Sequence, residues 1–251
     1  MIFAAGLGTR LKPLTDTMPK ALVRVGGKPL LWHVVMRLRD AGYEHLVVNV
    51  HHFAQMIVDY LSENDNFGIS ISISDETSGL LETGGGIKKA LPLFDPSSPI
   101  LIHNVDILSN LDLGSLIQPA APLDALLVVS PRQTQRYLLF DTSATAPLGR
   151  KVLCGWTNVA TGEVRSPWPG LDPSLKQPLA FSGIHVLWPS VFPLFAEMPQ
   201  RFGIIDFYLK YCRTCTFEGL EKDDLRLMDV GKLDTLGAAE QFLRDLPAQR
   251  I

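Results

Sequence analysis

The sequence predicts an α/β domain in which a mostly parallel sheet is flanked by helices. One observation is the apolar, β-branched run at residues 46–50, which is typical of a strand buried on both faces. Another is the helical spacing of apolar residues at 30–41 and 54–62, on either side of that strand. Strands that alternate with helices form parallel sheets, and ligands bind at the carboxyl ends of such strands.

The individual elements follow from local patterns. The apolar residues 2–5 predict a buried strand that ends in a glycine loop. Gly42 ends the helix predicted at 30–41. In residues 69–73 isoleucine alternates with serine, which predicts a strand with one exposed face. The other predicted elements are a short helix ending at 90, a strand at 100–104, a glycine-interrupted strand at 181–187, a helix opening at 204–209 and a final helix at 232–245.

Residues 118–178 differ in composition from the rest of the chain. They are rich in proline, serine and threonine and contain only short β-like runs. We expect an irregular β insert here that closes over the edge of the sheet. A chain of 251 residues can hold one large domain, or at most two small ones. We therefore predict a single domain with two halves, residues 1–117 and 118–251.

The composition argues against several classes of protein. The net charge of −3 argues against broad binding to nucleic acid or to anionic membranes, and no apolar run has transmembrane length. Cys212 and Cys215 form one C-x-x-C pair, but no second pair or histidine cluster completes a zinc site, and a thioredoxin-like motif would lie near the first strand of its fold. We therefore interpret these two cysteines and Cys154 as reduced thiols of a cytoplasmic protein. The six histidines have no metal-ligand spacing and are interpreted as structural or surface residues. Only five residues precede the first loop glycine, and a start further upstream is an open alternative.

Residues 3–20 contain the strongest functional signal. Gly6 and Gly8 let the backbone turn and approach a ligand, so that successive N–H groups can point at phosphate oxygens. A dinucleotide fingerprint needs a third glycine, and a P-loop needs Gly-Lys-Ser/Thr; both are absent. Solvated surface charges remain the alternative interpretation of the basic residues. The candidate phosphate contacts are Ala5, Gly6, Gly8, Thr9, Arg10 and Lys20.

The ordered set G-x-G-T-R-L-x-P-L-T followed by P-K, from Gly6 to Lys20, resembles the signature of the sugar-nucleotide pyrophosphorylases. These nucleotidyltransferases join a nucleoside triphosphate to a sugar 1-phosphate. The resemblance implies a Rossmann-like fold of the nucleotide-diphospho-sugar transferase type with a small β-rich sugar-binding insert. The first half would bind the nucleotide and the second half the sugar. It also implies catalytic roles for Arg10 on the departing pyrophosphate and for Lys20 near the α-phosphate.

The segment LETGGGI at residues 81–87 has three consecutive glycines, which are unfavourable unless the backbone must lie close to something. It resembles the variant in bacterial N-acetylmuramate 1-phosphate uridylyltransferases, while related guanylyltransferases have a similar glycine segment. The resemblance implies that this segment faces the nucleotide base. A glycine-rich helix start without a ligand is the alternative. The candidate nucleotide contacts are Glu82, Thr83, Gly84 and Gly85.

Two aspartates are candidate metal ligands. Asp106 follows a predicted buried strand, where a hard oxygen ligand is well placed to hold a divalent cation. Its context N-V-D resembles the family motif N-G-D, with Val105 in place of glycine. Asp229 lies in M-D-V-G, which resembles the second metal motif, D-x-G. The resemblance implies Mg²⁺ as the cofactor.

The expected sugar contacts rest on resemblance alone. Gly183 lies in a segment that resembles the sugar-contacting strand, and Asp206 would point into the site by analogy. The family's Glu-Lys-Pro has no counterpart, because the corresponding region reads Gly-Trp-Thr-Asn and ends at Asn158. We carry over Asn158 as the contact there, and the family's lysine cannot be carried over.

The implied reaction is attack of a sugar 1-phosphate oxygen on the α-phosphorus of the triphosphate. UTP is the expected nucleotide, and the expected partners are this triphosphate and a sugar 1-phosphate, in a monomer or homodimer without nucleic acid or membrane. A mannose or heptose 1-phosphate guanylyltransferase is one alternative. A non-catalytic sugar-nucleotide-binding regulator is another. No β-helix repeats follow the last helix, so no appended β-helix domain is expected.

Overall fold

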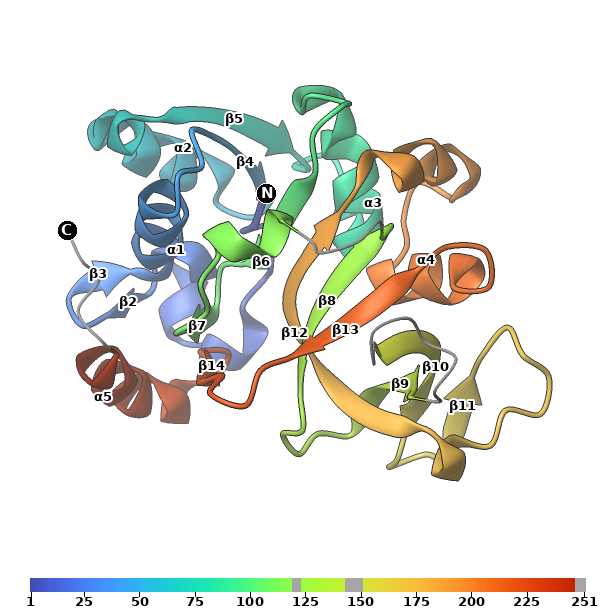
Figure 1. The fold of residues 1–251 in the computed structure, drawn as a ribbon. Helices are drawn as coiled ribbons and strands as arrows, with labels where there is room; N and C mark the ends of the chain where they lie inside the picture. Colours follow the sequence, from blue (N-terminus) through green and yellow to red (C-terminus); the bar gives the residue numbers. More distant parts are fainter. Residues whose placement is uncertain (119–122, 143–150, 247–251) are drawn as a thin grey trace.

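The computed structural model of the protein describes residues 1–118, 123–142 and 151–246, and Figure 1 traces them in chain order. Within these residues, ten strands form one sheet that runs through the molecule. The strands, in the order in which they lie side by side, are β11 (Glu163–Arg165), β10 (Lys151–Asn158), β13 (Phe217–Glu221), β8 (Ala125–Ser130), β12 (Gln177–Leu187), β6 (Ile100–Asn104), β1 (Ile2–Phe3), β4 (His45–Val50) and β5 (Ser70–Asp75), with β9 (Arg136–Asp141) pairing with both β10 and β12.

The first half of the sheet is parallel. Strand β1 pairs in parallel with both β4 and β6, and β4 pairs in parallel with β5. In β4 the neighbouring residues Val47 and Val48 are both fully buried but belong to different hydrophobic clusters, one on each face of the sheet. This burial explains why the segment has no polar alternation and confirms the strand predicted there.

The second half of the sheet is mostly antiparallel, which differs from the predicted arrangement. Strand β12 pairs antiparallel with β6, β8 and β9, and only β13 and β8 pair in parallel. The strands of the predicted insert are therefore continuous with the main sheet, which is mixed. Residues 119–122 and 143–150 of that insert lie outside the described part of the chain.

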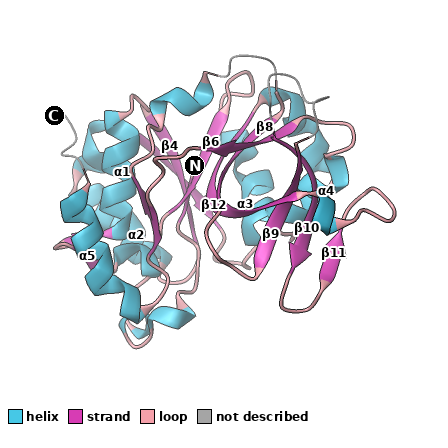
Figure 2. Ribbon diagram, turned by 60° about the horizontal axis from the view of Figure 1, so that its bottom comes forward, coloured by secondary structure: helices cyan, strands magenta, loops and turns pink. Residues whose placement is uncertain are grey.

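Helices cover both faces of the sheet. Figures 1 and 2 show α1, α2 and α5 on one side and α3 and α4 on the other. Each group packs on its own hydrophobic cluster. Among the described helices, none is long and apolar enough to span a membrane. Their bounds are α1 (Leu30–Asp40), α2 (Ala54–Glu63), α3 (Glu82–Ala90), α4 (Ile204–Tyr211) and α5 (Leu236–Asp245).

Short elements complete the fold. The strand pairs outside the main sheet are β14 (Leu227–Asp229) with β7 (Ile107–Ser109) and β2 (Arg24–Val25) with β3 (Lys28–Pro29). The 3-10 turns are η1 (Thr9–Leu11), η2 (Leu14–Asp16), η3 (Lys20–Leu22), η4 (Asp65–Gly68), η5 (Leu91–Leu93), η6 (Gly114–Ile117), η8 (Pro173–Leu175), η9 (Pro189–Glu197) and η10 (Leu233–Thr235).

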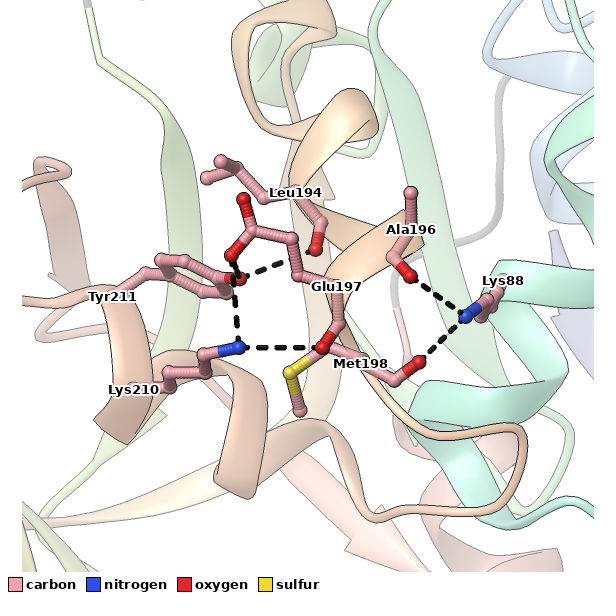
Figure 3. A network of polar contacts seen from close by, with 7 residues as sticks. All are labelled: Lys88, Leu194, Ala196, Glu197, Met198, Lys210 and Tyr211. Atoms are coloured by element: carbon pink, nitrogen blue, oxygen red, sulfur yellow. Dashed lines mark hydrogen bonds and ion pairs between the residues drawn. The ribbon is translucent and has the colours of Figure 1, made fainter.

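Helices α3 and α4 are linked through the end of η9 (Figure 3). Lys88 of α3 donates hydrogen bonds from Nζ to the carbonyl oxygens of Met198, at 2.6 Å, and Ala196, at 3.3 Å. From α4, the hydroxyl of Tyr211 donates to Oε2 of Glu197 at 2.8 Å. These bonds hold the start of the connecting segment, residues 198–203, which leads into α4.

Candidate active site

A cavity of about 240 Å³ lies at the carboxyl ends of the parallel strands. This is the edge at which the sequence predicted ligand binding. The cavity brings the glycine loop, the start of α3 and the end of β6 together. Its lining residues are Phe3, Ala4, Ala5, Gly6, Lys20, Asn49, Glu76, Leu80, Glu82, Thr83, Asn104, Val105 and Asp106.

The two glycines of the loop, Gly6 and Gly8, are explained by different features of the structure. Gly8 has a φ of +63°, and a Cβ there would come within 2.8 Å of Cγ2 of Thr15 and 3.0 Å of Cβ of Lys20. Gly8 is thus required by the turn itself. A Cβ on Gly6 would meet no described atom within 4 Å, although Gly6 lines the cavity. The free space at Gly6 is available to a ligand.

Asn49 and Glu76 form a buried polar network behind the loop. The N–H groups of Ala4 and Ala5 donate to Oδ1 of Asn49 at 2.7 and 3.2 Å. Nδ2 of Asn49 donates to Oε1 of Glu76 at 2.8 Å, and the N–H of Leu81 donates to Oε2 of Glu76 at 3.1 Å. The backbone N–H of Ala5 is therefore bonded within the protein, although the residue lines the cavity.

The sequence interpretation missed both of these polar residues. An asparagine in the middle of an apolar strand run was the available signal for Asn49, because a buried amide needs hydrogen-bond partners. Glu76 is fully buried and follows directly after β5. The network fixes the end of β1 relative to β4 and the start of α3.

The start of α3 packs closely on the connecting segment. The N–H groups of Gly84 and Gly85 donate to the carbonyl of Phe202 at 2.9 and 3.1 Å, and a Cβ on Gly84 would overlap the Phe202 ring. The hydroxyl oxygen of Thr83 accepts from the N–H of Ile204 at 2.9 Å. Close packing within the protein thus explains both glycines, against the Phe202 ring at Gly84 and against the carbonyl oxygen of Gln200 at Gly85. Glu82 and Thr83 line the cavity, and a nucleotide contact for all four residues stays a prediction.

The two candidate metal ligands come from distant parts of the chain. The N–H of Val230 donates to the carbonyl of Asp106 at 2.8 Å, and Asp229 pairs with Ile107 where β14 joins β7. Asp106 forms an ion pair with Lys20 inside the cavity. Beside Gly231, the position of a Cβ would be 2.7 Å from Oδ1 of Asp229 and 2.8 Å from Nη2 of Arg10. The fold therefore gathers the four predicted charged residues at one edge.

The donor set fits a magnesium ion that is shared with a substrate. Mg²⁺ is commonly held by one or two carboxylates together with substrate phosphates and water. Asp106 and Asp229 supply two carboxylates at this edge. In the described ranges, no group of three or more histidine, cysteine or acidic side chains is arranged to hold a metal. The remaining ligands would have to come from phosphate oxygens and water.

Of the predicted sugar contacts, Gly183 lies next to the cavity. It has a φ of +79° at a register shift in β12, and a Cβ there would overlap the side chain of Asn104. Asn104 itself lines the cavity. Gly183 thus leaves space for Asn104. From the sequence, that residue was interpreted only as part of the N-V-D motif.

Asn158 and Asp206 do not line the cavity. Oδ1 of Asn158 accepts from the N–H of Ala160 at 3.1 Å within its own turn. Asp206 accepts from Nη2 of Arg165 at 2.5 Å and from the N–H of Gly203 at 3.3 Å. Sugar contacts at Asn158 and Asp206 stay predictions.

Two buried histidines are unsuited to acid–base catalysis at neutral pH. Burial lowers the pKa of His103 to about 4 and that of His185 to about 3, so both imidazoles are neutral at pH 7. His185 shares a hydrogen bond with the hydroxyl of Tyr208 in the core. Burial also raises the pKa of the Cys212 thiol to about 12, which keeps it protonated.

Comparison with known proteins gives one family. The model of the nucleotidyl transferase family matches residues 1–137. N-acetylmuramate alpha-1-phosphate uridylyltransferase of Caulobacter vibrioides is 37% identical over 197 residues, or 76% of this chain and 75% of the relative. The enzyme of the same name from Neisseria meningitidis is 44% identical over 124 residues, or 49% of this chain and 53% of the relative. Mannose-1-phosphate guanyltransferase of Kluyveromyces lactis is 37% identical over 110 residues, or 43% of this chain and 30% of the relative.

Solved structures share the fold over nearly the whole chain. HddC from Yersinia pseudotuberculosis, complexed with GMP-PN, has a TM-score of 0.72 at 21% identity and covers 96% of this chain and 97% of its own. A UDP-glucose pyrophosphorylase complexed with UDP-glucose has a TM-score of 0.74 at 17% identity, with 97% of both chains covered. The predicted nucleotide-diphospho-sugar transferase type of fold is confirmed.

Proposed function

The chain belongs to the nucleotidyl transferase family, and from this membership and the site geometry we propose that it joins a nucleoside triphosphate to a sugar 1-phosphate and releases pyrophosphate. The observation that carries the proposal is the meeting of Lys20 and Asp106 in a cavity beside the glycine loop, with Arg10 and Asp229 at the same edge. The two basic side chains can bind polyanions directly, and the two carboxylates would do so through a divalent cation.

The reaction is a displacement at phosphorus. An oxygen of the sugar 1-phosphate forms a bond to the α-phosphorus, and the bond from that phosphorus to the bridging oxygen breaks. The electron pair stays on the departing pyrophosphate. Because the attacking phosphate is already an anion at neutral pH, the step needs no general base. The neutral, buried His103 and His185 agree with such a mechanism.

The residues of the cavity and of the adjoining edge have separate roles that follow from their charge and position. The open space at Gly6 lets a phosphate approach the backbone, and Lys20 offers its ammonium group near the α-phosphate. Arg10 stabilises negative charge on the departing pyrophosphate through its planar donors. Asp106 and Asp229 would hold Mg²⁺, which supplies neutralisation of phosphate charge when bound. Charge neutralisation and positioning are thus the main sources of rate acceleration.

UTP is the proposed nucleotide and N-acetylmuramate 1-phosphate the first sugar substrate to test. Two relatives carry the name N-acetylmuramate alpha-1-phosphate uridylyltransferase, and one of them aligns with 76% of this chain. The LETGGGI segment resembles the same variant. The second candidate, GTP with mannose 1-phosphate, is favoured by the shorter match to a mannose-1-phosphate guanyltransferase. We further propose a cytoplasmic enzyme, monomeric or homodimeric.

A panel assay of pyrophosphate release tests this proposal. The purified protein is mixed with UTP or GTP, with N-acetylmuramate 1-phosphate or mannose 1-phosphate, and with Mg²⁺. We expect release only when all three components are present, with the larger specificity constant for UTP. Full turnover in excess chelator would contradict the metal assignment. Binding of a nucleotide sugar without turnover in any combination would favour the regulator instead.

A further inference from the structure

We propose that Arg165 binds the anionic group of the sugar substrate and that Asp206 positions Arg165 instead of contacting the sugar. The anionic group is the phosphate of the sugar 1-phosphate or a carboxylate on the sugar, and these share the chemistry that a guanidinium recognises. The inference rests on the proposed function and deepens it, because it assigns a substrate contact in the half of the molecule where sequence motifs failed.

Asp206 is committed to contacts within the protein. Its Oδ1 accepts from Nη2 of Arg165 at 2.5 Å, and its Oδ2 accepts from the N–H of Gly203 at 3.3 Å as part of the N-terminal cap of α4. A carboxylate in the first turn of a helix is further stabilised by the helix dipole. Asp206 is thus held in place by α4 and holds Arg165 in turn.

Two partners orient the Arg165 side chain, and some of its hydrogen-bond donors stay free. It lies on β11 directly opposite Trp156 of β10, and its guanidinium carbon lies 5.6 Å from the centre of the Trp156 ring. The aromatic face fixes the plane of the guanidinium, and Asp206 fixes its rotation. The side chain remains 41% exposed. Among the described contacts, the guanidinium donates only one hydrogen bond, from Nη2 to Asp206. The second proton of Nη2 can still bind an anion in the bidentate geometry, together with a donor on Nη1 or Nε.

The Arg165–Asp206 pair lies next to the rim of the cavity. The position of a Cβ on Gly203 would be 3.5 Å from Oδ2 of Asp206 and 3.8 Å from Oε2 of Glu82, which lines the cavity. The bond from the N–H of Ile204 to Thr83, also a lining residue, fixes the start of α4 to the same rim. A sugar that extends from the cavity toward α4 would meet Arg165.

The other basic side chains near this region are less suited to the role. Lys151 pairs with Glu221 at 2.5 Å, and Lys176 pairs with Asp141 at 2.9 Å. Arg201 pairs with Glu82 at the rim but is 67% exposed, and no aromatic ring is described beneath it. Arg165 is therefore the better preorganised of the two arginines, and Arg201 is the competing candidate.

The test compares Michaelis constants of matched variants. Arg165→Ala, Arg165→Lys, Asp206→Asn and Arg201→Ala are assayed with UTP and with two sugar phosphates, N-acetylmuramate 1-phosphate and N-acetylglucosamine 1-phosphate, of which only the first carries a carboxylate. Arg213→Ala is the control, because Arg213 also stacks on a tryptophan, Trp168, at 5.9 Å. Thermal unfolding of each variant separates misfolding from lost binding.

We expect Arg165→Ala to raise the KM for the sugar phosphate by about 10- to 100-fold, the scale of a charged hydrogen bond, with the KM for UTP unchanged. Arg165→Lys should restore part of the loss, and Asp206→Asn should give a smaller increase. An increase with both sugars identifies the phosphate as the bound group, and an increase confined to N-acetylmuramate 1-phosphate identifies the carboxylate. An unchanged KM in Arg165→Ala, or an increase only in Arg201→Ala, would overturn the inference.

Direct titration of the sugar 1-phosphate by calorimetry keeps the two proposals apart. A wild-type protein that binds the sugar phosphate without turnover would contradict the proposed function only. Equal affinity in the wild-type protein and in Arg165→Ala would contradict the role of Arg165, whatever the turnover.

Discussion

The two halves of the sheet bring their candidate site residues together in different ways. In the parallel half, the residues around the cavity come from a few short segments, such as the loop from Ala5 to Lys20 and the start of α3. In the antiparallel half, the best candidate for a sugar contact, Arg165, depends on how the strands pair. Arg165 and Trp156 lie opposite each other on β11 and β10, and Asp206 of α4 accepts a hydrogen bond from Arg165. The candidate residues of the parallel half can therefore be predicted from their spacing in the sequence. Those of the antiparallel half can be recognised only from the strand pairing in the structure.

The first and largest expected effect tests whether the loop is chemical machinery. Arg10→Ala should lower turnover by roughly 100-fold or more, the scale of losing one preorganised charge stabiliser. Arg10→Lys should restore only part, because it keeps the charge without the planar donors. Turnover and thermal unfolding are measured on the same purified protein. Wild-type turnover in Arg10→Ala would show that Arg10 is a surface charge without a catalytic role.

Substitutions of two glycines distinguish an effect on stability from an effect on ligand binding. Gly84→Ala should destabilise the protein by about 1–3 kcal/mol, because its Cβ would overlap the ring of Phe202 in the core. Gly6→Ala should leave the unfolding temperature nearly unchanged, since the free protein has room for that Cβ, but raise the KM for the triphosphate. Thermal unfolding and steady-state kinetics of both variants check this contrast. An equally stable Gly84→Ala would show that close packing is not the reason for the glycine.

The ion pair of Lys20 and Asp106 predicts how a metal binds before the nucleotide arrives. Both side chains are mostly buried, at 12% and 15% exposure, so Lys20 competes with a cation for Asp106. Lys20→Met should bind Mn²⁺ about tenfold more tightly in the absence of triphosphate, a difference of about 1.4 kcal/mol. Electron paramagnetic resonance titration measures the free ion. Lys12→Met, which removes an exposed pair with Asp16, is the control and should leave the affinity unchanged.

The smallest expected effect lies away from the cavity, in η4. Asn66 has a φ of 48°, a left-handed conformation that glycine adopts more easily. Asn66→Gly should raise the free energy of unfolding by about 0.5 kcal/mol, because it relieves this strain. Turnover should be unchanged. A chemical denaturation curve checks the first expectation, and a fall in turnover would show that the turn and the cavity are coupled.

Much of the parallel half could be predicted because ligand chemistry and local geometry act on short segments. The turn at Gly8 and the carboxylate at Asp106 are needed within a few residues of a strand end, so they leave a readable pattern. The reason for Gly84 and Gly85 could not be predicted, because the groups that exclude a Cβ are the ring of Phe202 and the carbonyl oxygen of Gln200, both far along the chain.

The antiparallel half was predicted less well because its strands belong to the main sheet but have irregular sequence patterns. Strand β12 borders β6, β8 and β9, and a residue such as Gly183 is shaped by Asn104 across the pairing. The polar pair Asn49 and Glu76 was missed for a similar reason, since each satisfies the other only after β4 and β5 align.

The hydrogen bond between Val230 and Asp106 can form only late, while the chain is being synthesised, because the two residues are far apart in the sequence. A growing chain can form the parallel strands and the glycine loop soon after β6 has left the ribosome, because those contacts lie within the first half. Asp229 joins them only when β14 docks on β7, after nearly all of the described chain has been made. Contacts of such long range form late in folding. The second candidate carboxylate would thus reach the edge of the sheet only after the last described strand has docked.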